Sequence, residues 1–330
     1  MEITLTENGI YNFKSISDII ETSKKYKARR KRTRFDDNMT YNIDMEKLSD
    51  CIEPLEKLNN LIGMEDIKKN IVDQLLFYAQ DLNTNEMMHI CLTGPPGVGK
   101  TTVGKILAEI YCSLGFLTTD KFKVVGRADL VGGYLGQTAI KTKKLLKDSL
   151  GGVLFIDEAY SLGSGKSDDD SYAKECIDTI NQFISENTSE FILIIAGYKN
   201  ELERCFFSMN PGLRRRFPWV YDLKDYTNKN LKDIFIYQVK ENKWGFEESL
   251  KENDYKLLED VFLDKKLFKN NGGDTLALFD FTKICHSRRV FGQKKKLKKK
   301  LNITDISSAM EMLKKKNTVH TNEPPYGMYV

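Results

Sequence analysis

One segment of this 330-residue sequence combines residue types and spacing that suit phosphate chemistry. Residues 94–101 read Gly-Pro-Pro-Gly-Val-Gly-Lys-Thr and match the pattern G-x-x-x-x-G-K-[ST]. Glycines let backbone N–H groups approach phosphates closely, and the helix that follows points its positive dipole end at the same phosphates. We therefore predict a site for a nucleoside triphosphate. The predicted nucleotide-binding residues of this loop are Gly94, Pro95, Pro96, Gly97, Val98, Gly99, Lys100, Thr101 and Thr102.

A second segment ends in two acids. Residues 153–158 read Val-Leu-Phe-Ile-Asp-Glu, an apolar run followed by Asp157 and Glu158. Open α/β sheets bind ligands at the carboxyl ends of their strands, so this run would place both acids beside the phosphates. We expect Asp157 and Thr101 to hold Mg²⁺, Lys100 to neutralise phosphate charge, and Glu158 to orient or deprotonate the attacking water. The alternative is an acidic strand end on the surface, which the glycine loop disfavours.

The wider pattern supplies the elements that must position these residues. Between Leu58 and Tyr221 short apolar runs alternate with amphipathic stretches, which indicates a parallel sheet flanked by helices. The expected strands cover 90–93, 122–125, 152–156, 191–196 and 219–222, and the expected helices cover 64–79, 101–111, 138–149, 171–185 and 199–206. Beyond Asp225 the apolar spacing is helical, over 231–239, 255–268, 276–289 and 305–315.

These patterns divide the chain into four parts. We expect a basic, partly disordered N-terminal arm over 1–50 and an α/β nucleotide-binding domain over 51–225. A small all-helical lid domain over 226–318 and an irregular tail over 319–330 would follow.

Four longer phrases carry a family resemblance. They are DLVGGYLGQTA at 129–139, GGVLFIDEAY at 151–160, AGYK at 196–199 and NPGL at 210–213. With the Leu-Ile-Gly phrase at 61–63, the stretch to Asp225 resembles the AAA+ ATPases, and more narrowly the CbbX/CfxQ group that includes the stage V sporulation protein K. The resemblance covers about half of the chain strongly and the helical lid weakly. It implies a P-loop NTPase fold, ATP and Mg²⁺ as cofactors, and ATP hydrolysis.

The resemblance also implies roles for residues outside the glycine loop. Gly63 would lie near the adenine, and Tyr134, Leu135 and Gly136 would form a pore loop in which Tyr134 grips a threaded polypeptide. The alternative for Tyr134 is packing on its own domain. Arg216 occupies the position of an arginine finger supplied to a neighbouring subunit, although Arg214 and Arg215 leave this assignment open. A finger acting in trans requires a homo-oligomer, and a hexameric ring is expected.

Two sensor positions depart from the wider family pattern. For the first sensor, Tyr198 and Asn200 are the candidates. For the second sensor, Gly-Gly-Asp-Thr at 272–275 stands where the family has an arginine, so Arg288 or Arg289 would have to substitute. How hydrolysis couples to lid motion is therefore open.

Composition limits the class of protein and its partners. The net charge of +4 gives no overall polyelectrolyte character, but basic runs occur at 24–34 and 294–300. The first run is compatible with a nucleic acid partner or a nuclear localisation signal, and a solvated charged segment is the alternative for both runs.

The start of the chain lacks a signal-peptide layout, and the longest apolar run, 191–196, is too short to span a bilayer. The six cysteines have no metal-binding spacing, so we expect free thiols. These features predict an intracellular soluble protein of the cytoplasm, with the nucleus as an alternative.

We therefore expect an ATP-driven ring that remodels an unidentified protein substrate by threading it through a pore. One alternative is a nucleic-acid-associated AAA+ ATPase, such as a loader or helicase-like factor that uses the basic N-terminal arm. The other is a non-hydrolysing nucleotide switch or scaffold, which the missing second sensor arginine would suit.

Overall fold

The computed structural model describes residues 13–30, 44–82, 86–134, 136–163, 171–188, 191–247 and 258–319. The chain divides into two compact units. The first contains Met1–Gly94 and Lys100–Leu223, and the second contains Pro95–Gly99 and Lys224–Val330.

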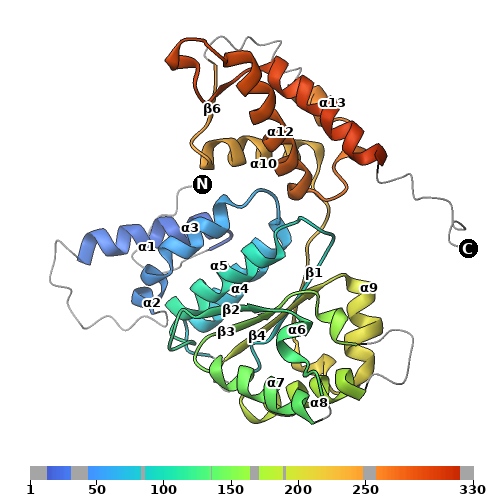
Figure 1. Cartoon of the computed structure of the whole chain (residues 1–330). Coiled ribbons are helices and arrows are strands. Elements are labelled where there is room, and N and C mark those ends of the chain that lie inside the picture. Colours follow the sequence, from blue (N-terminus) through green and yellow to red (C-terminus); the bar gives the residue numbers. More distant parts are fainter. Residues whose placement is uncertain are drawn as a thin grey trace, which may run out of the picture. The chain divides into compact units, whose positions relative to one another are not determined.

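The first unit is built on a five-stranded parallel sheet, which confirms the predicted fold class (Figure 1). Its strands are β1 (Ile90–Thr93), β2 (Phe122–Val125), β3 (Val153–Ile156), β4 (Ile192–Gly197) and β5 (Trp219–Asp222). They lie in the order β2-β3-β4-β1-β5. Strands β1, β3 and β4 are buried along their whole length, which explains why they read as continuous apolar runs.

Helices cover both faces of this sheet. Figure 1 shows α4 (Glu65–Tyr78) and α5 (Lys100–Ser113) on one face, and α7 (Gln137–Asp148) and α8 (Ser171–Glu186) on the other. Successive β3 side chains alternate between the faces, as a strand requires. Phe155 meets Gly104 of α5, where an added Cβ would lie 2.7 Å from the ring. The shorter elements are α6 (Arg127–Leu130), α9 (Lys199–Glu201) and helical turns at Ala159–Leu162, Leu202–Phe206, Phe207–Met209 and Arg214–Arg216.

The described part of the N-terminal arm is helical and packed, whereas its sequence indicates only weak periodicity. It forms α1 (Ile16–Arg30) and α2 (Met45–Asp50), and α3 (Ile52–Asn60) follows directly after it. In α1 the buried side chains include Ile16, Ile19 and Ile20, which share one helical face. Residues 1–12 and 31–43 lie outside the described part of the chain.

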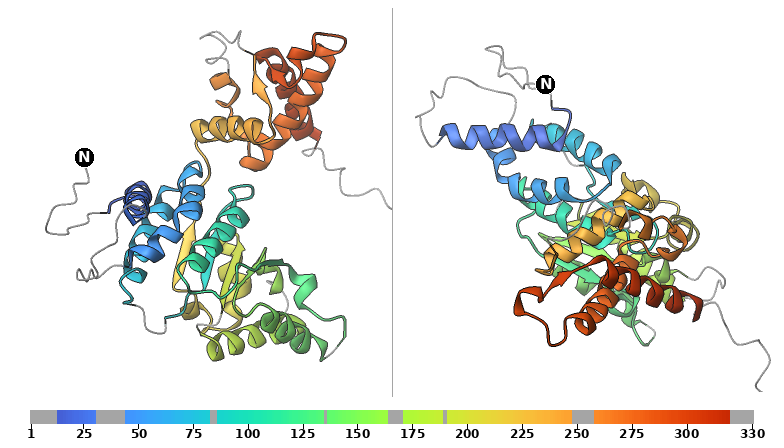
Figure 2. Two further views of the ribbon diagram at one scale, coloured as in Figure 1. Left: turned by 90° about the vertical axis from the view of Figure 1, so that its left-hand side faces the viewer. Right: turned by 90° about the horizontal axis from the view of Figure 1, so that it is seen from above.

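The second unit is mainly helical. It contains α10 (Asn228–Glu241), α12 (Gly272–Val290) and α13 (Ile303–Val319), drawn in orange and red in Figure 2. The strands β6 (Gly245–Phe246) and β7 (Lys300–Leu301) also pair, but two residues each are too few to produce a sequence signal. Of the helix expected over 255–268, residues 255–257 lie outside the description and Lys265–Leu267 form a short 3-10 turn.

Two further expectations concern cysteines and membranes. All six cysteines are unpaired, which confirms the expected free thiols. None of the helices in the described part of the chain combines the length and the apolar character that a membrane-spanning segment needs.

Candidate nucleotide site

The glycine loop adopts a backbone that only glycines accept readily. Gly97 and Gly99 have φ values of 71° and 89°, in the left-handed region. Gly94 has φ 146°, and a Cβ added there would lie 2.4 Å from the carbonyl oxygen of Leu223. Helix α5 begins at Lys100, so its N-terminus directly follows the loop. This strand, loop and helix order is the setting in which backbone N–H groups bind phosphate.

Lys100 lies among the charged groups of the site. Its Nζ donates to the carbonyl oxygen of Gly94 at 2.9 Å and lies 5.5 Å from the ring centroid of Tyr198. Burial lowers the pKa of Lys100, while the carboxylates of Asp157 and Glu158 act in the opposite direction. A partly desolvated ammonium beside two acids can exchange those contacts for phosphate oxygens.

The two predicted acids follow β3 directly. The Asp157 N–H donates to the carbonyl of Val125 at 2.9 Å, and its Oδ1 accepts from the Glu158 N–H at 3.0 Å. Glu158 is exposed and has φ 49°, an uncommon conformation for a residue other than glycine and one that is frequent at functional sites.

The residues present fit a magnesium–nucleotide complex. The Asp157 carboxylate and the Thr101 hydroxyl are hard oxygen donors, and Mg²⁺ usually takes few protein ligands together with water and substrate phosphates. Among the described residues, no group of three or more His, Cys, Asp and Glu side chains could hold a metal by itself. Thr101 and Thr102 lie exposed in the first turn of α5.

Pro95–Gly99 belong to the second compact unit, where Asn271 and Tyr226 bind them. The side-chain amide of Asn271 donates to the Pro96 carbonyl at 3.2 Å and to Asp225 Oδ1 at 2.9 Å. The Tyr226 hydroxyl donates to the Val98 carbonyl at 2.9 Å. Sequence reasoning missed Asn271, although an asparagine before Gly-Gly at a helix start was the available signal.

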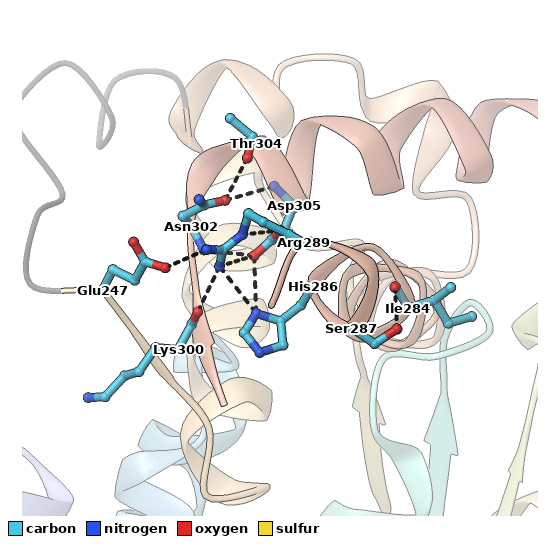
Figure 3. A network of polar contacts seen from close by, with 9 residues as sticks. All are labelled: Glu247, Ile284, His286, Ser287, Arg289, Lys300, Asn302, Thr304 and Asp305. Carbon is cyan, nitrogen blue, oxygen red and sulfur yellow. Dashed lines mark hydrogen bonds and ion pairs between the residues drawn. The ribbon is translucent and has the colours of Figure 1, made fainter. Parts of the chain in front are cut away.

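The sensor candidates differ in how they are engaged. Tyr198, at the end of β4, is 38% exposed and stacks on Tyr160. Asn200 and Arg288 are exposed. Arg289 instead donates hydrogen bonds from all three guanidinium nitrogens to Asp305 and Glu247 of the second unit (Figure 3).

The three consecutive arginines also have different surroundings. Arg214 lies 3.2 Å from Glu203 and stacks on the Phe207 ring, and Arg215 is exposed. Arg216 donates from Nε to Ser185 Oγ at 2.7 Å and from Nη1 to the Gly212 carbonyl at 2.6 Å. Sequence reasoning missed Ser185, because only the tertiary fold brings α8 to this turn.

The predicted pore loop is exposed where the structure describes it. Tyr134 is 74% exposed, and a Cβ added at Gly133 or Gly136 would meet no atom within 4 Å. Leu135 lies outside the described residues. Gly63, expected near the adenine, lies in the turn between α3 and α4 with φ 71°.

Comparison with known proteins places this site in a family. Residues 90–223 match the family described as "ATPase family associated with various cellular activities (AAA)". A putative cfxQ-like protein of Acanthamoeba polyphaga mimivirus is 40% identical over 294 residues, which cover 88% of this chain and 71% of that protein. The chain belongs to the CbbX/CfxQ-like AAA+ ATPases. A CfxQ homolog of Galdieria sulphuraria is 32% identical over 293 residues, covering 84% of this chain and 93% of that protein.

This CbbX/CfxQ-like protein is therefore an ATP-hydrolysing enzyme and a remodelling factor. A chloroplastic ribulose bisphosphate carboxylase/oxygenase activase of Cyanidioschyzon merolae is 38% identical, covering 58% of this chain and 68% of that protein. Among solved structures, the FIGL-1 AAA domain in complex with ADP aligns with a TM-score of 0.56 at 18% identity, covering 82% of this chain and 90% of that one. The Thermotoga maritima RuvB motor aligns with a TM-score of 0.53 at 22% identity, covering 77% and 71%. These two likenesses concern the fold alone.

Proposed function

We propose that this chain is a ring-forming ATPase that pulls a segment of a protein substrate through a central pore. The observation that carries this proposal is Tyr134, a large aromatic side chain that is 74% exposed on a turn flanked by glycines. An aromatic ring held away from any core can contact a passing polypeptide through both its faces and its edge.

For ATP hydrolysis, the protein has to position the attacking water and the phosphates and to neutralise the phosphate charge. Lys100 would bind the β- and γ-phosphates, Asp157 and Thr101 would hold Mg²⁺, and Glu158 would orient the attacking water and accept its proton. The remaining predicted loop residues, with Gly63 near the adenine, bind the rest of ATP. When bound, Mg²⁺ would neutralise charge that develops on the phosphates.

Arg216 completes the site of a neighbouring subunit. Its two hydrogen bonds to Ser185 and Gly212 hold the guanidinium at a fixed place on the surface of its own subunit. Because the positive charge that reaches the γ-phosphate comes from a neighbouring subunit, we expect isolated subunits to hydrolyse ATP slowly. A heterologous contact of this kind gives a ring when the rotation between neighbouring subunits closes, and we propose a closed hexamer.

The substrate class is a protein assembly. The relative from Cyanidioschyzon merolae is named an activase of a carboxylase, which supports action on a folded enzyme. The comparisons do not support a nucleic acid partner. In the described part of the N-terminal basic run, Lys24 pairs with Glu56 and Lys25 with Glu21, at 2.5 and 2.6 Å.

The test compares ATP turnover with and without casein, an unfolded polypeptide used as the probe. We expect casein to stimulate wild-type turnover severalfold and to leave Tyr134→Ala at its basal rate. Tyr237→Ala is the matched control, because Tyr237 is also exposed, at 52%, but lies on α10. If Tyr134→Ala responded to casein as the wild type does, threading by this loop would be wrong.

A further inference from the structure

The short helix α6 lies in the sequence between β2 and the predicted pore loop, and it contacts the turn Ala159–Leu162. At the first residue of this helix, Arg127 Nη1 donates to the carbonyl oxygen of Ser161 at 2.7 Å. The Ser161 N–H in turn donates to the carbonyl oxygen of Glu158 at 2.7 Å. Two successive hydrogen bonds therefore join α6 to the backbone of the acid proposed to orient water.

The other end of α6 is bonded to α7. The Lys141 ammonium donates to the carbonyl oxygens of Ala128 and Val131 at 2.6 and 3.0 Å. The buried hydroxyl of Thr142 donates to the carbonyl oxygen of Leu130 at 3.0 Å. Carbonyl groups at the C-terminus of a helix lack partners within it, and a positive charge beside them is favourable. Because both of its ends are bonded, α6 links its two neighbours mechanically.

The predicted pore loop continues directly from α6. The Gly132 N–H donates to the hydroxyl oxygen of Thr138, a buried residue of α7, at 3.1 Å. A Cβ added at Gly132 would lie 2.7 Å from the Cβ of Gln137, so the base of the loop packs closely on the start of α7. The Gln137 N–H donates to the carbonyl oxygen of Tyr134 at 3.2 Å. The exposed ring of Tyr134 therefore stands on a base that is held by α6 and α7.

We propose that Arg127 couples ATP hydrolysis to the grip on the substrate, because it links the backbone of Glu158 to the loop that carries Tyr134. This coupling rests on the threading function proposed above and names the residue that transmits it. Arg127 acts through Ser161, so it is a positioning residue.

The backbone of Glu158 makes this link sensitive to the nucleotide. Its φ of 49° is one that a residue other than glycine keeps only when its surroundings hold it, and the Ser161 N–H is part of those surroundings. A rearrangement of Glu158 between nucleotide states would act on Ser161, and the charge-assisted hydrogen bond of Arg127 would carry it to α6. Because coupling is reciprocal, a polypeptide bound at the Tyr134 loop would also favour one state of the nucleotide site.

The test variant is Arg127→Met, which keeps most of the side-chain length but removes the guanidinium. We expect its basal ATP turnover to stay within about twofold of the wild type, because the Ser161 N–H still holds Glu158. Stimulation by casein, severalfold in the wild type, should fall below about 1.5-fold. Arg127→Lys can still donate to a carbonyl and should recover part of the stimulation. Lys123→Met on β2 is the matched control, because it also removes an exposed positive charge and should respond as the wild type does.

The affinity for labelled casein, measured by fluorescence anisotropy, tests the coupling without turnover. In a Glu158→Gln background, which should hold ATP unhydrolysed, the Kd for casein should differ at least about fivefold between the ATP-bound and nucleotide-free protein. Adding Arg127→Met should bring the two Kd values within about twofold of each other. A purely structural role would instead weaken casein binding in both states alike and leave their ratio unchanged, which would overturn the coupling role.

Failure of the proposed function would give a different result. If casein neither bound nor stimulated the wild type, threading would be wrong, and the coupling role would fall with it. If the wild type responded to casein and Arg127→Met responded as strongly, only the coupling role of Arg127 would be wrong.

Discussion

Replacing Arg289 by alanine would remove the centre of a largely buried ion network in the second unit (Figure 3). Asp305 is 2% exposed and accepts from Arg289 Nε and Nη2, each at 2.8 Å. Glu247 accepts from Nη1 at 2.7 Å. After the replacement, His286 Nδ1 at 3.3 Å and the Asn302 N–H at 3.1 Å would remain beside Asp305.

The burial of the ion pair between Arg289 and Asp305 sets the expected loss in the free energy of unfolding. Removing one partner of a buried ion pair destabilises a protein by about 3–5 kcal/mol, whereas exposed pairs contribute below about 1 kcal/mol. Because the Arg289 side chain is 26% exposed, we expect the lower end, about 3 kcal/mol. The matched control is Arg288→Ala on the same helix. The Arg288 side chain is exposed, so its removal should change the free energy of unfolding by less than about 0.5 kcal/mol.

Urea unfolding of the full chain followed by tryptophan fluorescence measures this cost. In a Trp219→Phe background, which removes the signal of the other tryptophan on β5, Trp244 is a local reporter, because its ring centroid lies 5.1 Å from that of His286. We expect the transition reported by Trp244 to move to lower urea in Arg289→Ala and to stay unchanged in Arg288→Ala. If Arg289→Ala unfolded as the wild type does but lost ATP turnover, the side chain would act as the second sensor, and its role in stabilising the second unit would be refuted.

Three further predictions follow from the first unit. Gly94→Ala should weaken ATP binding more than about tenfold by calorimetry, because its Cβ would meet a carbonyl oxygen at 2.4 Å, whereas Gly126→Ala, with open space around it, should not. Ser185→Ala should lower kcat about threefold at unchanged ATP affinity, since Arg216 loses a hydrogen bond that orients it; a change in affinity alone would contradict this. Burial lowers the pKa of His89 to about 4 from 6.5, so its contribution to stability is present above about pH 6.5 and is lost towards pH 4, by up to about 3 kcal/mol. As the pH is lowered from 6.5 to 4, the urea midpoint of the wild type should fall, and that of His89→Gln should change less. If the midpoints of both proteins fell equally with pH, His89 would not be the group responsible.

Much of the fold could be predicted because buried parallel strands leave a strong local pattern. Each of the strands β1 to β5 is a run of mainly apolar residues, and the expected bounds differ from the observed ones by at most one residue. The glycine loop was equally predictable, since Gly94, Gly97 and Gly99 have backbone angles that other residues avoid.

Features that depend on tertiary contacts could not be predicted in this way. The side chains of Arg216 and Ser185 meet although 31 positions separate them in the sequence. The partner of Arg289 in α13 is 16 positions away, and helical periodicity alone leaves Arg288 and Arg289 equivalent. Tyr160 ends the GGVLFIDEAY segment at 151–160, but its stacking on Tyr198 depends on the pairing of β3 with β4.

If one subunit's Glu158 works with a neighbour's Arg216, two variants that are inactive on their own should recover turnover when they are mixed. Arg216→Ala keeps Glu158, and Glu158→Gln keeps the arginine, so each alone should be inactive. In randomly mixed rings at equal amounts, a site needs both groups from adjacent subunits, which predicts about a quarter of wild-type turnover for a heterologous ring. A mixture as inactive as its two components would show that Glu158 and Arg216 do not act together across subunits.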